Sequence, residues 1–388
     1  MVKDNGVVGR EAVSIRELIL FGEQGDPRAL KTFSNVPYFL VKHLEDQGVI
    51  VHTVDLSIRE VWQKIIRRLY DSVLHFFYRT AFSFQRSKWH NRINSYKIRT
   101  ALARYPNADA CMFTSFSFSA VDFTDKPTYL FCDWDHYDLF HYHLQRTPDQ
   151  MEQQLVDREK GCIELARAVF VLFPGAAERM RKRYVQPHIF YLGNVVNNLE
   201  EPDVRLIKQK QESQILLFIG NYRYLEGFHD VLASFTKLKK KFPALTLHAI
   251  GISTSHVKQV PAGVYLHGYL DKDNPEQREK YYSLANSASV YVNTQPKWSA
   301  FSATLEMMYF YTPIIISSYE EFEITFGEQI NFGFYHERNC DLSNEIESIL
   351  TTPEYSQLGQ NAHNAAKSHN WSSLVNEIRK KMEQTYAG

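Results

Sequence analysis

The sequence lacks the features that mark secreted, metal-binding and membrane-spanning proteins. Its four cysteines form no CxxC pair, which argues against a zinc site and against a disulfide scaffold. No run approaches the roughly eighteen apolar residues of a membrane-spanning helix, and residues 1–10 lack the apolar core of a signal peptide. We therefore expect a protein of the reducing cytoplasm.

The chain also has no excess of either charge. Lysine and arginine total 44, and aspartate and glutamate total 44 as well. A balanced chain has no long-range field that would attract nucleic acid, so we expect no nucleic-acid partner. Apolar residues occupy 44% of the 388 positions, and this length exceeds what one hydrophobic core usually organises. The composition therefore predicts two folded domains.

Short apolar runs alternate with helical patterns along both halves of the chain. This alternation is typical of parallel sheets that carry helices on both faces. The polar segment 197–213 interrupts the alternation and is the best linker candidate. We expect strands at 17–22, 49–55, 110–114, 128–132 and 168–172 in the first half, and at 215–220, 245–250, 264–267, 289–292 and 313–317 in the second.

A stretch of small residues precedes one helical pattern of the second half. Residues 299–303 read Ser-Ala-Phe-Ser-Ala, and Glu306 follows about one turn into the helix. Free backbone N–H groups and the helix dipole at such a start favour an anion, for which a diphosphate is a natural guest. The Glu306 carboxylate can then accept hydrogen bonds from vicinal ribose hydroxyls. An ordinary first-turn glutamate that complements the dipole is the alternative.

Polar and aromatic residues follow the fourth expected strand, where ligand groups gather in parallel sheets. Asp133, Asp135 and His136 are suited to bind ligand hydroxyls or to act as a general base, although a packed histidine is the alternative for His136. The Asp133-Trp-Asp135 run is similar to a metal-diphosphate motif, and His141 and His143 have chelating spacing. No third ligand is evident, so we expect no metal site.

The region 64–104 is strongly basic and rich in aromatic residues. It holds ten lysines and arginines against a single acid, Asp71. One interpretation is a surface for anionic membrane lipid or for a phosphate-bearing acceptor. The other is a solvated helix pair whose charges are balanced by acids elsewhere in the fold.

Three segments of the second half together resemble the donor-binding domain of the retaining GT-B glycosyltransferases (glycosyltransferase family 4-like, group 1). Segments 217–227, 267–285 and 298–317 occur in the family's order and spacing. In the first half, residues 33–48 are similar to the first helix of that fold, with Ser34-Asn35 at or near the place of the family's glycine pair. Asn194-Val-Val-Asn resembles the family's Asn-Gly-Val-Asp at the domain junction.

The resemblance implies an α/β protein of the GT-B fold, in which two Rossmann-like parallel-sheet domains face each other across a cleft. The acceptor-side domain would span 1–196 and the nucleotide-sugar donor-binding domain 197–365. A C-terminal helix at 366–388 would pack back towards the first domain.

The implied function is that of a hexosyltransferase. It would move a sugar from a nucleotide-sugar donor to a glycan or lipid-linked acceptor with retention, in bacterial surface polysaccharide or glycoconjugate synthesis. No metal or other cofactor is required. The enzyme would be cytoplasmic and peripheral on the inner face of the plasma membrane through the basic region 64–104.

The resemblance also assigns roles to individual residues. We take Glu306, Asp133 and His136 as catalytic candidates, His136 as a base if the enzyme inverts configuration. The expected donor-binding residues are Gly220, Asn221, Arg223, Lys297, Ser299, Phe301, Ser302, Ala303 and Glu306.

Several positions depart from the family pattern. Trp298 stands where the family has the first glutamate of an acidic pair, so the donor-sugar contact must be absent or rebuilt. Asn221 and Glu226 replace the Arg and Lys that contact the diphosphate, and Arg223 or Lys297 would supply the missing charge. These departures keep open a catalytically weakened partner subunit. A sugar-nucleotide epimerase of the same fold, which needs no acceptor, is the other alternative.

Overall fold

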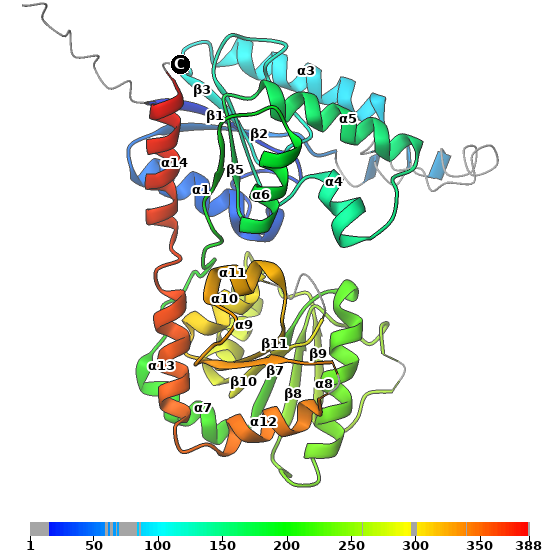
Figure 1. Cartoon of the computed structure of the whole chain (residues 1–388), viewed down its shortest axis with the longest axis vertical. Helices are drawn as coiled ribbons and strands as arrows, with labels where there is room; N and C mark the ends of the chain where they lie inside the picture. The colour runs from blue at the N-terminus through cyan, green and yellow to red at the C-terminus, as the bar shows by residue number, and fades with distance from the viewer. Residues whose placement is uncertain are drawn as a thin grey trace, which may run out of the picture.

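Two six-stranded parallel β-sheets form the framework of the chain, one in each half of the sequence (Figure 1). The computed structural model describes residues 15–58, 61–62, 65–66, 68–69, 84, 87–257, 259–295, 301–338 and 340–386.

The first sheet has the strand order β2-β1-β3-β4-β5-β6, and all its pairs are parallel. Its inner strands are short apolar runs, and every residue of Ala110–Phe113 is buried. Strands that are covered on both faces are expected to show this continuous pattern. The strands are β1 (Glu17–Gly22), β2 (Ile50–Asp55), β3 (Ala110–Phe113), β4 (Thr128–Cys132), β5 (Ala168–Val171) and β6 (Ile189–Tyr191).

Local sequence signals start the helices of this domain. In α5, Asp149 accepts from the backbone of Glu152 while the Glu152 side chain accepts from the Asp149 N–H, a reciprocal capping box. Pro174 stands at the first turn of α6, where its missing N–H costs nothing. The helices are α1 (Val36–Asp46), α3 (Lys88–Arg104), α4 (His136–Asp138), α5 (Gln150–Leu165) and α6 (Pro174–Arg183).

The second sheet repeats the architecture with the order β12-β11-β10-β7-β8-β9. Its strands are β7 (Ile215–Ile219), β8 (Thr246–Ile250), β9 (Val264–Gly268), β10 (Val290–Asn293), β11 (Ile314–Ser317) and β12 (Gly333–His336). Its helices are α7 (Ile207–Ser213), α8 (Leu225–Leu238), α9 (Pro275–Ser287), α10 (Phe301–Tyr309), α11 (Glu320–Phe326), α12 (Leu342–Thr351) and α13 (Tyr355–Ala366).

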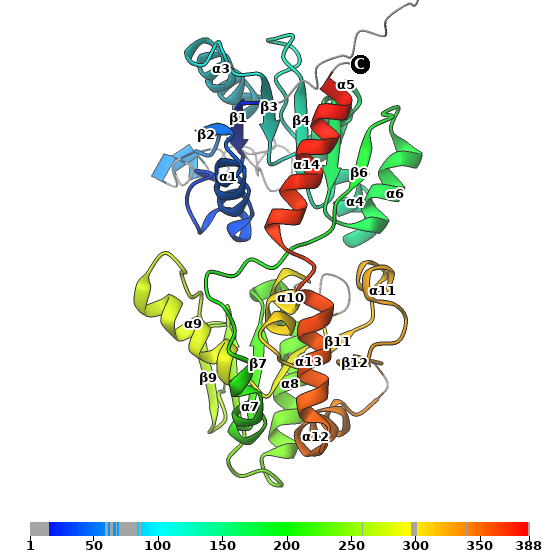
Figure 2. The same cartoon turned by 90° about the vertical axis from the view of Figure 1, so that its left-hand side faces the viewer.

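The last helix, α14 (Trp371–Tyr386), returns to the first domain. Figure 2 shows α13 beside the second sheet and α14 beside the first. The Trp371 ring stacks on Phe39 of α1 with 5.9 Å between ring centroids, and the Tyr129 hydroxyl donates to Met382 O over 3.1 Å. The C-terminal segment therefore ties the two halves of the chain together.

The two predicted parallel sheets are observed, with two differences in detail. The strands β6 and β12 were not predicted, because Ile189–Tyr191 has only three residues and the run Gly333–His336 is short and half polar. The expected linker 197–213 is not free along its length, since it holds α7, in which Ile207 and Lys210 are buried. Within the described part of the chain, no helix is long and apolar enough to cross a membrane.

Candidate functional site

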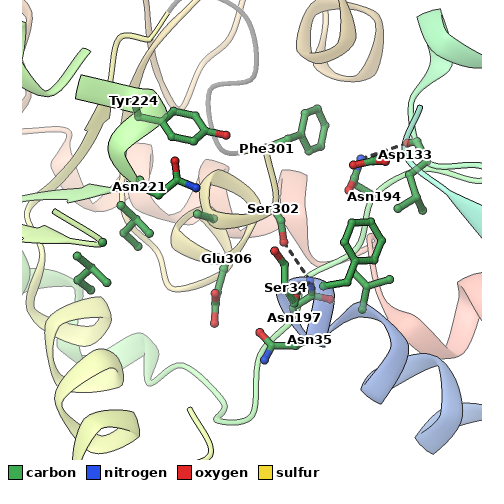
Figure 3. A pocket seen from close by; sticks show the side chains of 18 of the residues that line it. Ser34, Asn35, Asp133, Asn194, Asn197, Asn221, Tyr224, Phe301, Ser302 and Glu306 are labelled. Atoms are coloured by element: carbon green, nitrogen blue, oxygen red, sulfur yellow. Dashed lines mark hydrogen bonds between the residues drawn. The ribbon is translucent and has the colours of Figure 1, made fainter. Parts of the chain in front are cut away.

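A cavity of about 390 Å³ lies between the two domains and is lined by both (Figure 3). The first domain contributes the loop before α1 and the residues that follow β4. The second contributes the loop after β7, the segment after β9 and the first turns of α10. Because these segments follow the carboxyl ends of parallel strands, the cavity occupies the position where α/β folds bind ligands.

The loop that opens α1 has an unusual backbone. Phe33, Ser34 and Asn35 adopt φ angles of 41°, 54° and 69°, and all three line the cavity. These left-handed conformations favour glycine, yet none of the three is a glycine. This loop therefore has a conformation that glycines adopt easily, but it is built from residues with side chains, and their backbone is strained.

The start of α10 forms the facing wall. Ser302 and Ala303 line the cavity in the first turn of this helix, and Glu306 lies one turn deeper (Figure 3). Phe301 anchors the start by packing edge-on against Phe173 of the first domain, with 5.5 Å between centroids. The expected donor-binding residues Lys297 and Ser299, like Trp298, lie outside the described residues.

Glu306 is held by four hydrogen bonds inside the second domain. Lys272 Nζ lies 2.7 Å from Oε1 and 3.0 Å from Oε2, so the two residues form a buried ion pair. The hydroxyls of Tyr281 and Tyr282 donate to Oε2 and Oε1 over 2.7 and 3.2 Å. Burial, and then the charge of Glu306, raise the pKa of both tyrosines, which keeps them as donors. Sequence reasoning missed Lys272, because no local pattern marks it.

Asn197 connects the two walls. Its amide group donates to Ser34 O over 3.1 Å and to Ser302 Oγ over 3.0 Å, and its Oδ1 accepts from Trp371 Nε1 over 2.9 Å. It is 3% exposed. One buried side chain therefore links the loop before α1, the start of α10 and the last helix.

Charged contacts join the domains at a second place. Arg179 of α6 lies 2.9 Å from Glu320 and 3.2 Å from Glu321, both at the start of α11. The Gly175 N–H also donates to Glu321 Oε2 over 2.8 Å. Glu321 lines the cavity, and its burial raises its pKa despite these partners.

The loop after β7 brings two of its predicted residues to the cavity. Gly220 and Asn221 line it, and a Cβ on Gly220 would lie 2.9 Å from the Tyr224 side chain, so the close approach requires glycine. The Asn221 side chain accepts from the Arg223 N–H over 2.9 Å. The Arg223 side chain itself is exposed and is not among the residues that line the cavity.

Asp133 lies on the first-domain side of the cavity, across from α10. Its Oδ1 accepts from Trp134 N over 2.9 Å and from Cys132 Sγ over 3.1 Å. Burial raises the pKa of Asp133 against these hydrogen bonds. The structure therefore brings Asp133 and Glu306 to one cavity from opposite domains.

His136 is not among the residues that line the cavity. Its Nδ1 lies 2.7 Å from Glu159 Oε1, and its backbone N–H donates to Glu159 Oε2 over 2.8 Å. Burial raises the pKa of Glu159, but the charge and hydrogen bonds of His136 outweigh it and lower the pKa. Glu159 was not predicted, and its only sequence signal is an acid on the inner face of α5.

Asp135 has a role in the scaffold of the first domain. It caps α4 by accepting from Asp138 N, and its Oδ2 lies 2.8 Å from Arg183 Nη1. Burial, and then the neighbouring Asp138, raise the pKa of Asp135 to about 6 against the opposing charge of Arg183. Within the described ranges, no three His, Cys, Asp or Glu side chains are grouped to hold a metal ion.

Comparisons with known proteins identify the fold. No protein-family model and no curated protein sequence matches the chain. Sucrose-phosphate synthase from Thermosynechococcus elongatus is similar with a TM-score of 0.69 at 16% identity, over 96% of this chain and 99% of that one. WaaG, a glycosyltransferase involved in lipopolysaccharide biosynthesis, is similar with a TM-score of 0.66 at 12% identity, over 94% and 98%. Anabaena HepE in complex with UDP and glucose is similar with a TM-score of 0.62 at 12% identity, over 95% of this chain and 99% of that one.

These likenesses extend over nearly the whole chain in each case. They show that the chain has the GT-B fold of two parallel-sheet α/β domains, which confirms the predicted fold class.

Proposed function

We propose that the protein is a glycosyltransferase that uses a nucleotide-sugar donor. The observation that carries this proposal is the cavity between the domains, which joins the start of α10 and the Glu306 network to Asp133 of the other domain. The fold supports it, because its structural neighbours include WaaG, named as a glycosyltransferase, and HepE, which holds UDP and glucose.

The donor diphosphate would bind at the first turn of α10. Backbone N–H groups and the helix dipole stabilise negative charge there, and they stabilise it further as the diphosphate departs with the bond electrons. Ser302 Oγ accepts from Asn197, so its own proton is directed to another acceptor. The ribose would lie one turn deeper, beside Glu306. Binding both substrates in line supplies the remaining catalysis.

The finer assignment rests on the segment resemblance. We propose a hexose donor, retention of configuration, and a glycan or lipid-linked acceptor in bacterial surface polysaccharide or glycoconjugate synthesis. Asp133 lies where an acceptor would enter from the first domain, and its carboxyl group can bind acceptor hydroxyls. We expect no cofactor. Proton NMR of the anomeric centre in the first product formed distinguishes retention from inversion.

We further propose a cytoplasmic protein that contacts the inner face of a membrane through the basic region. The described part of that region supports this proposal. Helix α3 contains five lysines and arginines and no acid, and its exposed side chains include Trp89, Ile93 and Tyr96. Interfacial helices combine these residue types.

A catalytically weakened partner subunit remains the second candidate. Arg223, one of the two expected replacements for the missing diphosphate cations, lies outside the cavity lining. A weakened subunit would bind nucleotide and turn over no donor.

Release of nucleoside diphosphate from a panel of UDP-, GDP- and ADP-sugars tests the proposal. We expect one donor to be consumed, faster with acceptor present, and to raise the melting temperature, since ligand at 100 times its Kd stabilises by about 2.7 kcal/mol. Binding without turnover would favour the weakened subunit, and donor conversion without release would favour the epimerase. No binding of any nucleotide would contradict all three functions.

A further inference from the structure

The carboxylate of Glu306 is saturated with hydrogen-bond donors. An ionised carboxylate offers about four acceptor positions on its two oxygens. Here Oε1 accepts from Lys272 and Tyr282, and Oε2 accepts from Lys272 and Tyr281, at distances between 2.7 and 3.2 Å. Glu306 therefore cannot accept two further hydroxyls while all these partners stay in place.

The partners of Glu306 differ in their access to the cavity. Lys272 and Tyr281 line it, whereas Tyr282 does not and also accepts from Leu199 N over 2.8 Å. A ligand that reaches Glu306 therefore also reaches the ammonium group of Lys272. Because the pair is buried, separating it would leave an unpaired charge, which is costly. A ligand that uses the pair intact avoids that cost.

Lys272 still has donor capacity for such a ligand. Its ammonium group has three N–H donors, and two of them serve Glu306. Among the described residues, the third has only a long hydrogen bond of 3.4 Å to Asn197 O, which a ligand hydroxyl can replace. It is also the only lysine or arginine among the described residues that line the cavity. The Tyr281 ring lies 4.1 Å from Nζ and holds the ammonium group on that side.

We propose that Lys272 and Glu306 read the vicinal diol of the donor ribose as a pair. The Lys272 ammonium donates to one hydroxyl oxygen, and the Glu306 carboxylate accepts a hydrogen bond from the other hydroxyl in place of its bond from Tyr281. Lys272 is thus a donor-binding residue that determines specificity for ribose over deoxyribose. A site built to bond a hydroxyl rejects an analogue without it, because its buried polar groups are left unpaired.

This inference rests on the proposed function, and calorimetric titration tests the two separately. The probes are whichever of UDP, GDP, ADP and CDP binds the wild-type protein most tightly, and its 2′,3′-dideoxy counterpart. We expect the wild type to bind the ribose form at least about tenfold more tightly, the value of one charge-assisted hydrogen bond. Failure of the wild type to bind any of the four would overturn the proposed function. Equal binding of the two forms would overturn only the ribose inference.

The substitution Lys272→Met should weaken binding of the ribose nucleotide at least about tenfold and binding of the dideoxy nucleotide less than about twofold. Equal weakening of both forms would indicate a phosphate contact or a structural role and would overturn the inference. Since Lys272→Met leaves Glu306 without its cation, the double variant Lys272→Met with Glu306→Gln provides a neutral pair that relieves the buried charge. It should also lose the preference for ribose, and retention of that preference would contradict the proposal.

Lys210→Met is the matched control. Lys210 is another buried lysine of the same domain, bonded to Ala285 O, Phe310 O and Thr312 Oγ1, and it does not line the cavity. Its loss should lower the melting temperature and leave the ratio of the two affinities unchanged. A changed ratio in Lys210→Met would show that the preference for ribose depends on the stability of the domain, and the result for Lys272→Met would then not support a contact with ribose.

Discussion

The side-chain amide of Asn197 donates to Ser302 Oγ over 3.0 Å, which joins the segment between the domains to the first turn of α10. The same amide donates to Ser34 O, and its oxygen accepts from Trp371. A ligand that contacts Ser302 is therefore linked, through the single side chain of Asn197, to the loop before α1 in the opposite domain.

Replacing Asn197 with alanine should lower both stability and nucleotide affinity. The buried Trp371 N–H would lose its acceptor, at about 1–3 kcal/mol, the Ser34 carbonyl would lose a part-buried hydrogen bond, and Ser302 would lose the group that orients it. Chemical denaturation and calorimetric titration measure the two effects.

The neighbouring Asn198 supplies the control for this prediction. Among the described residues, its side chain bonds only to Glu200 and Glu201 on the surface, so Asn198→Ala should leave affinity unchanged. Unchanged affinity in both variants would limit Asn197 to a structural role.

The periodicity of the sequence predicted most of the fold. Buried parallel strands are continuous apolar runs. Ten such runs were predicted, and they correspond to the observed strands β1–β5 and β7–β11. The edge strands β6 and β12 were missed, and each of them has only one buried residue. Edge strands carry a weaker signal, because one side of their ladder meets solvent.

The candidate site was only partly predictable. Glu306 and Asp133 lie near motifs or strand ends, so local sequence found them. Asn197 lies in the Asn194-Val-Val-Asn segment that the sequence marked, but its partners were not predicted. Lys272 and Glu159 act through partners that are distant in sequence, for example 34 positions between Lys272 and Glu306. A single sequence does not encode such pairings locally, and the identification of these residues required the three-dimensional structure.

Glu306→Ala should weaken nucleotide binding at least about tenfold, because it removes a charge-assisted contact of about 1.5–3 kcal/mol. It should also destabilise the protein, since Lys272 loses its buried partner. Tyr282→Phe separates the two effects, because Tyr282 bonds the same carboxylate but does not line the cavity. We expect this control to lose stability and keep affinity. Full affinity in Glu306→Ala would remove the carboxylate from the ligand site.

Ser34→Gly should raise the free energy of unfolding by roughly 0.5–1 kcal/mol. Ser34 has a φ angle of 54°, and a left-handed conformation costs a non-glycine residue about 1–2 kcal/mol, part of which glycine loses again to chain entropy. Urea denaturation measures the change. The control Ser234→Gly, within helix α8, should instead lower the free energy of unfolding by about 1 kcal/mol. A loss of stability in Ser34→Gly would mean that the loop is not strained.

The stability of the first domain should depend on the ionisation of Asp135. Burial and Asp138 raise the pKa of Asp135 from 3.8 to about 6 in the folded protein. Because the folded protein binds the Asp135 proton more tightly than the unfolded chain, the protonated carboxyl group contributes stability that is fully present below about pH 4. This contribution is lost as the pH rises through about 6. The difference in unfolding free energy between wild type and Asp135→Asn should therefore fall from pH 4 to pH 6 and stay constant above about pH 7.

Asp341 provides a control of opposite sign for this titration. Backbone and side-chain hydrogen bonds with Ser343 lower the pKa of Asp341, so its contribution is present above the unfolded pKa and is lost as the pH falls. The difference between wild type and Asp341→Asn should rise with pH. If the Asp135 difference rose as well, the raised pKa of Asp135 would be wrong.

Helix α3 should bind vesicles that contain anionic lipid. Trp89 and Tyr96 are 58% and 72% exposed, and Lys88, Arg92 and Arg99 lie on the same helix without an acid among them. Each cation near an anionic surface contributes about 1 kcal/mol, and added salt screens this attraction within a Debye length of about 10 Å at 0.1 M. We expect the protein to sediment with vesicles of phosphatidylcholine and phosphatidylserine, and to be released by 0.5 M salt.

The paired substitution Trp89→Ala with Tyr96→Ala should reduce this sedimentation several-fold, because it removes apolar area that enters the lipid interface. Tyr265→Ala, which removes an exposed aromatic side chain of β9 in the other domain, should have no effect. No sedimentation with anionic vesicles, or full binding by the double variant, would show that α3 is only a solvated helix. Its positive charge would then act within the protein, where Lys97 already donates to the carbonyl groups of Asp55 and Ser57.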